Sequence, residues 1–205
     1  MPATERPTAI HISTSELSAL GVVWSLREAG IDAVHASGSE AGLAMVEQLR
    51  PALILIGTLH PEPPHRSFTL CREIVGRWPE SRIVLIQTDA DDELVQADAA
   101  IVGAESCLPS TASADELAAT CRDIVRGVHM SARELYISAF GLYGLTPRQR
   151  DVLRLAAEGK TAAEIASELD IKLATVRAHE RAIREKFNVS SIPAAVERAR
   201  RLGIV

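Results

Sequence analysis

The stretch LTPRQRDVLRLAAEGKTAAEIASELDIKLATVRAHERAIREKFNVSS occupies residues 145–191 and decides how the C-terminal part of the chain folds. Residues 146–149 (TPRQ) combine an N-cap threonine, a proline at the first helical position and a glutamine that can bond back to the cap. Residues 161–164 (TAAE) repeat the capping-box spacing just after Gly159, which suits the left-handed end of a helix. Asp170 tolerates positive φ and suits a tight turn. The pattern predicts two short helices in succession.

A third helix is expected over residues 173–188 and a fourth over residues 193–202. On the third helix, apolar side chains recur along one face and are expected to pack inward: Leu173, Val176, Ile183 and Phe187. The opposite face of this helix is basic. Two short helices joined by a tight turn, with a basic second helix, are typical of a helix-turn-helix. An all-α, four-helix module is therefore predicted.

The outward face of the third predicted helix suits double-stranded DNA. Arg177 and Arg181 lie one helical turn apart, and a guanidinium can bind guanine bidentately or clamp a phosphate. Ala178 lies between them and is small enough to let the helix approach base edges. Three further residues are placed for contacts to the DNA backbone: Thr161, Thr175 and Lys186. The alternative is a four-helix interaction module that does not touch DNA.

The same region resembles the LuxR/NarL-type (GerE-type) DNA-binding domain over residues 145–205. The motifs in register are the LTPR opening, the EIAxxL helix, the ATVxxH segment and the KFxVSS end. The resemblance implies base reading by Arg177, Ala178 and Arg181, and phosphate contacts by Thr175 and Lys186. It also implies that residues 193–202 form a dimer helix, with the contacts Ala195, Val196 and Ala199.

Three positions depart from the pattern of that family. Gln149 stands where glutamate is usual, Asp170 where the turn usually has glycine, and Ile192 where arginine is common. None of these changes removes the fold, but Ile192 takes away one expected phosphate contact.

The charge of the 205-residue chain is unevenly divided. Residues 1–144 carry 10 basic and 19 acidic side chains, a net charge of −9, whereas residues 145–205 carry 12 and 8, a net charge of +4. A polyanionic partner is therefore expected to meet the C-terminal part.

Residues 8–127 alternate between short apolar runs and amphipathic stretches. The apolar runs predict buried strands at residues 8–13, 32–36, 52–57, 82–87 and 104–108. Helices are expected between them, at residues 15–29, 39–49, 67–78, 91–100 and 113–127. Repeated βα units predict an α/β fold with a doubly wound, five-stranded parallel sheet. The predicted domains are residues 1–127 and 145–205, joined by a linker at 128–144.

This N-terminal region resembles a response-regulator receiver domain (CheY-like). The resemblance rests on Leu17 and Gly21 in the first helix and on the segments RPALILI, SRIVLI, GAESCL and SADEL. It implies where the phosphorylation machinery of a receiver would lie. The acidic pair maps to Ser13 and Thr14, the phospho-accepting aspartate to Gly57, the conserved hydroxyl to Gln87 and the lysine near Ser110.

These replacements remove the chemistry of aspartyl phosphorylation. Hydroxyls replace the carboxylates that Mg²⁺ prefers, and Gly57 has no side chain to act as a nucleophile. The chain has three lysines, Lys160, Lys172 and Lys186, so residues 1–144 contain none. We therefore expect a phosphorylation-deficient pseudo-receiver. Its uncharged, hydroxyl-rich cleft leaves two uses open: a constitutive dimerisation or docking module, or a small-molecule sensor at the carboxyl ends of the strands.

Other residues predict packing rather than chemistry. Cys71, Cys107 and Cys121 are odd in number and spread over separate elements, which favours buried thiols in a reducing cytosol over a disulfide framework. Residues 60–65 (HPEPPH) could place His60, Glu62 and His65 near a metal, but a stiff surface loop is the simpler expectation. Trp24 and Trp78 are expected in a core or an interface. No cofactor or metal is predicted.

The combined prediction is a cytoplasmic, bacterial-type transcription regulator that acts without aspartyl phosphorylation. It would bind inverted-repeat operator DNA as a homodimer. The alternatives are a ligand-sensing regulator that uses the former phosphorylation pocket, and an antagonist that sequesters a partner regulator by heterodimerisation. An enzyme is not expected, because the sequence has no nucleophile elbow, no Gly-rich phosphate loop and no paired catalytic carboxylates. The N-terminus shows no secretory signal, and no apolar run approaches the ~20 residues of a membrane helix.

Overall fold

A computed structural model describes residues 6–62, 66–90, 93–128 and 144–205. The chain divides into two compact units, Met1–Leu135 and Tyr136–Val205, and each unit is described by itself. The predicted linker, residues 128–144, lies outside the described residues except at its two ends.

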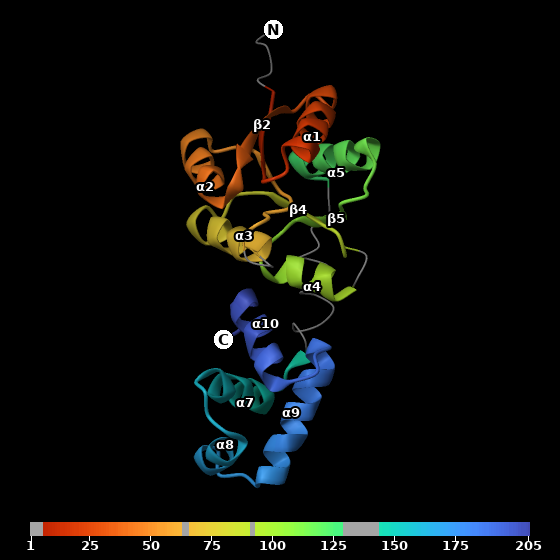
Figure 1. Cartoon of the computed structure of the whole chain (residues 1–205). Coiled ribbons are helices and arrows are strands. Elements are labelled where there is room, and N and C mark those ends of the chain that lie inside the picture. Colours follow the sequence, from red (N-terminus) through yellow and green to blue (C-terminus); the bar gives the residue numbers. More distant parts are fainter. Residues whose placement is uncertain (1–5, 63–65, 91–92, 129–143) are drawn as a thin grey trace. The chain divides into compact units, whose positions relative to one another are not determined.

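The N-terminal unit is built on a five-stranded parallel sheet (Figure 1). The strands are β1 (Thr8–Ser13), β2 (Asp32–Ser37), β3 (Leu53–Ile56), β4 (Ile83–Gln87) and β5 (Ser106–Pro109), in the order β2-β1-β3-β4-β5. The helices are α1 (Glu16–Glu28), α2 (Gly38–Leu49), α3 (Arg66–Arg77), α4 (Glu93–Ile101) and α5 (Ala114–Arg126). This order confirms the predicted doubly wound fold, with strand and helix ends shifted by a few residues.

Helices cover both faces of the sheet. α1 and α5 pack against each other and cover one face of the sheet (Figure 1). The buried Leu26, Leu117 and Ile124 meet the strands there. α2, α3 and α4 lie on the other face, against β1, β4 and β5 respectively. The predicted capping box of α5 is confirmed, since the Ser113 hydroxyl accepts from the Glu116 amide and the Glu116 carboxylate accepts from the Ser113 amide.

The C-terminal unit is all α in its described residues and contains α7 (Pro147–Ala157), α8 (Ala162–Glu168), α9 (Leu173–Phe187) and α10 (Ile192–Leu202). Both predicted capping boxes, at residues 146–149 and 161–164, are confirmed. Gly159 and Asp170 adopt positive φ of 88° and 50°, as their turns require. The four helices enclose one apolar core that includes Val152, Ile165, Val176, Ile183 and Phe187.

One core prediction is wrong. Leu173 is 38% exposed, because it is the first residue of α9 and lies before the turn at which Val176 enters the core.

Within the part of the chain that the structure describes, no helix is both long and apolar enough to cross a membrane.

Candidate nucleic-acid interface and the cleft of the α/β unit

α9 separates an apolar face from an exposed basic face. Val176, Ile183 and Phe187 are fully buried, while the predicted reading residues Arg177, Ala178 and Arg181 are exposed. Thr175 is exposed as well, in the first turn of the same helix. The structure therefore brings all four side chains to the solvent side of one helix, anchored from behind by the core.

The two arginines of this face differ in their partners. The Arg181 Nε donates to the Glu185 carboxylate at 2.9 Å, and the two side chains are 77% and 64% exposed. An ion pair this exposed contributes little to stability, so the guanidinium can exchange partners at small cost. Arg177 has no hydrogen bond or ion pair among the described residues.

Lys186 and Thr161 already have partners inside the unit. The Lys186 Nζ donates to the Gln149 Oε1 at 2.8 Å and to the Gly144 carbonyl, which fastens α9 to the start of α7. The Thr161 hydroxyl caps α8 and bonds the Glu164 carboxylate at 2.7 Å. Sequence reasoning did not foresee the bond between Gln149 and Lys186, because the two residues are far apart along the chain. The phosphate contacts of Lys186 and Thr161 stay predictions.

The predicted dimer contacts need a correction. Ala195, Val196 and Ala199 are buried in the core of their own unit, where α10 packs on α7 and α9. Their side chains are therefore not available to a second copy. The resemblance to the family implied that these residues form a contact surface, but they lie on the face of α10 that closes the helix-turn-helix core.

A shallow depression lies at the C-terminal end of α9, next to this surface. It has a volume of about 400 Å³ and is lined by Arg181, Arg184, Asn188 and Ser190, among others. The Arg184 Nη1 donates to the Ser190 carbonyl at 3.2 Å. The Glu185 carboxylate, the partner of Arg181, lines the same depression, so a phosphate bound there would have to displace it.

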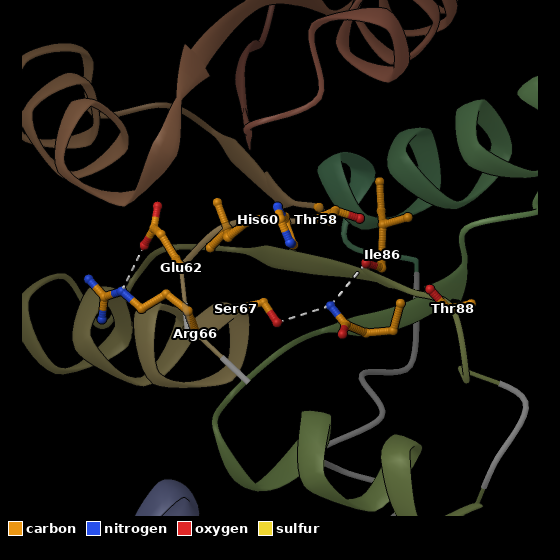
Figure 2. Close-up of a pocket in the computed structure, with 10 residues that line it drawn as sticks. Thr58, His60, Glu62, Arg66, Ser67, Ile86 and Thr88 are labelled. Atoms are coloured by element: carbon orange, nitrogen blue, oxygen red, sulfur yellow. Dashed lines mark hydrogen bonds and ion pairs between the residues drawn. The ribbon is translucent and has the colours of Figure 1, made fainter. Parts of the chain in front are cut away.

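The N-terminal unit has a cleft of about 230 Å³ at the carboxyl ends of β3 and β4, shown in Figure 2. Gly57, Thr58 and Gln87 line it, as expected. Ser13 is fully buried, and both its hydroxyl and that of Thr14 donate to the Thr58 carbonyl, at 3.1 and 3.3 Å. These hydroxyls therefore tie β1 to β3 and are not turned toward a ligand.

Gly57 occupies a position with little room for a side chain. A Cβ at Gly57 would lie 3.0 Å from the His11 Nε2 and 3.5 Å from the Ser13 Cβ. His11 is itself buried and stacks beside His35, with ring centroids 5.6 Å apart. The space next to the expected phosphorylation position is thus taken by an imidazole, which sequence reasoning did not identify.

The expectation of an uncharged cleft is wrong. Glu62 and Arg66 line one wall and bond each other at 3.3 Å (Figure 2). Glu62 also accepts from the Ser39 amide at 3.0 Å, at the start of α2. Burial alone would raise the pKa of Glu62, but the hydrogen bonds from Ser39 and the Arg66 charge hold it below its usual value. These residues lie beyond the strand ends, where a strand-based mapping does not reach.

The Gln87 side chain, which also lines the cleft, is held by two hydrogen bonds from its amide group. The Gln87 Nε2 donates to the Ser67 hydroxyl at 3.1 Å and to the Ile86 carbonyl (Figure 2). Ser110 does not line the cleft; its amide donates to the Gln87 carbonyl at 2.8 Å. The predicted pocket residues are therefore brought together, but mostly as partners of one another.

The cysteines and the loop considered for a metal add no further candidate site among the described residues. Cys71, Cys107 and Cys121 are free and buried, and burial raises the pKa of the Cys107 and Cys121 thiols to about 12. His65 of the loop considered for a metal lies outside the described residues. The described residues hold no group of three or more His, Cys, Asp or Glu side chains that could hold a metal.

Comparison with known proteins supports both resemblances. The family model "Bacterial regulatory proteins, luxR family" matches residues 144–199. The transcriptional regulatory protein DesR of Bacillus subtilis is 33% identical over 123 residues, which are 60% of this chain and 61% of DesR. The response regulator VraR of Staphylococcus aureus is 30% identical over 169 residues, which are 78% of this chain and 79% of VraR. The chain belongs to the LuxR family of bacterial response regulators.

The solved structures support the fold of both units. A structure of two RcsB dimers bound to two parallel DNAs matches with a TM-score of 0.66 at 16% identity, and the match covers 96% of this chain and 99% of RcsB. At that identity the likeness concerns the fold alone. Membership in the LuxR family therefore rests on the sequence matches, and the roles of single residues stay predictions.

Proposed function

We propose that this LuxR-family chain is a DNA-binding transcription regulator that acts without aspartyl phosphorylation. The observation that carries the proposal is the exposed face of α9, where Arg177, Ala178 and Arg181 lie opposite a fully buried apolar face. A helix held in this way can enter the major groove, where arginine reads guanine. The net charge of +4 on residues 145–205 favours the approach to phosphates.

The independence from phosphorylation is supported by the N-terminal cleft. Gly57 offers no nucleophile, residues 1–144 contain no lysine, and the Ser13 and Thr14 hydroxyls are occupied by the Thr58 carbonyl. A Mg²⁺ ion at this edge would lack the paired carboxylates that it prefers. We infer that the α/β unit acts by docking or dimerisation and not by enzymatic phosphotransfer.

Dimerisation and a two-fold operator form the second part of the proposal. A two-fold symmetric dimer reads an inverted repeat, because each copy presents the same helix to one half-site. The RcsB structure that matches this chain contains dimers on DNA, a property of RcsB. We extend the dimer to this chain as part of the proposed function.

The test is DNA capture with unmodified, full-length protein. Sheared genomic DNA is mixed with the protein at two salt concentrations and the bound fragments are sequenced, since non-specific phosphate binding fades as salt rises. We expect an inverted-repeat site to remain enriched at the higher salt. Absence of enrichment, together with a stable complex with another regulator, would favour the antagonist alternative.

A pair of matched variants tests the reading face. Arg181→Ala should weaken binding to the enriched site about 10- to 100-fold, since one bidentate base contact is lost. Arg154→Ala is the control, because Arg154 forms the same kind of exposed i,i+4 pair, with Glu158, on α7. The control should change affinity only a few-fold. Equal affinity of Arg181→Ala and wild type would refute the assignment of this face.

A ligand-sensing role keeps one observation in its favour, the cleft of about 230 Å³ bounded by Glu62 and Arg66. A ligand would have to compete with the bond between these two side chains. Thermal shift assays of wild type and Arg66→Ala with a metabolite library would test this role. A compound that stabilises only the wild type would support it.

A further inference from the structure

The start of α9 is exposed on all sides. Lys172, Leu173, Ala174 and Thr175 are all exposed, and the first residue of the helix to enter the core is the fully buried Val176. The N-terminal end of the proposed reading helix therefore extends beyond the core that holds it. In a helix-turn-helix, the N-terminal residues of the reading helix are the ones that contact base edges.

Leu173 is the large apolar side chain at this end. It is 38% exposed, and within the described residues of the C-terminal unit it is the one large hydrophobic side chain that is exposed. A single exposed leucine is common on a protein surface, so its exposure alone assigns no role. Its side chain has no hydrogen-bond donor, however, so a contact with a phosphate oxygen does not account for it.

The neighbours of Leu173 on the helix surface are the proposed reading residues. Leu173 and Arg177 are four positions apart in α9, so they lie side by side along one stripe of the helix. Long side chains of a helix lean toward its N-terminus, which directs the Arg177 side chain over the turn that begins at Leu173. Ala174 and Ala178 lie beside this stripe and are small, which leaves room for the edges of the bases.

We infer that Leu173 is a base-reading residue that contacts the 5-methyl group of a thymine, next to the guanine that Arg177 reads. The inference deepens the proposed DNA-binding function and rests on it. In the major groove only thymine, of the four bases, presents a methyl group, so an aliphatic side chain distinguishes it from the other three.

The geometry of the helix limits where this thymine lies. Four residues span about 6 Å along a helix axis, and successive base pairs are about 3.4 Å apart. The thymine should therefore lie one or two base pairs from the guanine of Arg177, on the side to which the N-terminus of α9 points.

Uracil substitution in the operator tests the inference, because uracil differs from thymine only by the missing methyl group. Full-length wild type and Leu173→Ala are titrated with the site enriched by DNA capture, in which each thymine of one half-site is replaced in turn. At one thymine the wild type should lose affinity about 3- to 10-fold, the effect of one buried methyl group. Leu173→Ala should bind the unmodified site more weakly by at least this factor, and uracil at that position should cost it nothing further.

Two controls separate this contact from a general effect on the protein. Leu49→Ala should keep the wild-type response to uracil at every position, since Leu49 is 46% exposed at the end of α2, in the other unit. Uracil at a thymine that another side chain contacts, such as Ala178, should cost all three proteins the same. Circular dichroism checks that both variants are folded.

The position of the guanine is found in the same way. Arg177→Ala should be insensitive to 7-deazaguanine, which lacks the N7 acceptor, at the one guanine where the wild type is sensitive. That guanine and the thymine should be one or two base pairs apart, and a larger separation would refute the joint reading by Leu173 and Arg177.

The outcomes distinguish this inference from the function on which it rests. Equal uracil responses of wild type and Leu173→Ala, with or without a uniform loss of affinity in the variant, would overturn the role of Leu173. Specific binding that still depends on Arg181 would then leave the DNA-binding proposal intact. A wild type that prefers no site at the higher salt concentration would refute the proposed function and this inference with it.

Discussion

The two units of this chain differ in whether the polar side chains of their candidate sites have partners within the unit. On α9, Arg177 and Arg181 extend into solvent with at most one weak partner, so they are available to another molecule. At the edge of the α/β sheet, Ser13, Thr14 and Gln87 are bonded to neighbouring parts of the same unit. The α9 side chains can bind another molecule, whereas the side chains at the sheet edge already have hydrogen-bond partners within their own unit.

This difference shows that fold and site are specified by separate residues. The sheet depends on buried strands such as β3 (Leu53–Ile56), whose residues are fully buried, and none of them takes part in phosphotransfer. By the resemblance, phosphotransfer in a receiver would depend on a few side chains at the strand ends, and the apolar framework does not depend on those side chains. A receiver fold is therefore no evidence of receiver chemistry.

The largest difference between the units should appear in their response to acid. Burial first, and the nearby His35 second, lower the pKa of His11 to about 4, while the unfolded chain titrates near 6.5. The neutral His11 imidazole therefore costs the folded α/β unit nothing above pH 6.5, and the free energy of unfolding decreases as the pH falls from 6.5 to about 4. The loss is about 3 kcal/mol, because the unfolded state binds the extra proton.

Tryptophan fluorescence can follow this unit alone, since Trp24 and Trp78 are the two tryptophans of the chain. Urea unfolding between pH 7.5 and 4.5 should show a falling midpoint in the wild type. His11→Leu, which cannot titrate, should show a shallower dependence over the same range. Parallel curves for the two proteins would contradict the role of His11.

A smaller effect is expected from the capping boxes, which occur in both units. Thr161→Ala removes the hydroxyl that caps α8 and should destabilise the C-terminal unit by about 1 kcal/mol. Ser113→Ala should do the same to α5 in the N-terminal unit. Thr161→Ser keeps the cap and serves as the control. Circular dichroism at 222 nm, read beside tryptophan fluorescence, shows which unit is affected, and equal loss in both signals would contradict independent units.

The parts of the fold that follow local rules could be predicted from the sequence. Capping boxes, helix-ending glycines and the alternation of strands and helices act over a few residues, so the elements and their order are confirmed. Leu173 was misplaced because periodicity assigns a face but does not show where a helix enters the core.

The site was harder to predict, because its determinants are long-range. The Glu62 carboxylate bonds Ser39 across 23 positions of sequence, and Lys186 bonds Gln149 across 37. No spacing rule connects such pairs. The dimer contacts on α10 were taken from the family resemblance, which does not show that these side chains close the core of their own unit.

The smallest expected effect is the response of the former phosphorylation pocket to a phosphoryl donor. Incubation with acetyl phosphate and Mg²⁺ should add no mass to the intact wild-type protein, measured by mass spectrometry. Gly57→Asp should also stay unmodified, because its Cβ would crowd the His11 imidazole, and one carboxylate without a lysine or an acidic pair does not rebuild the site. A phosphoryl adduct on the wild type would refute phosphorylation independence. An adduct confined to Gly57→Asp would show instead that this glycine alone blocks the chemistry, and that the rest of the pocket still supports it.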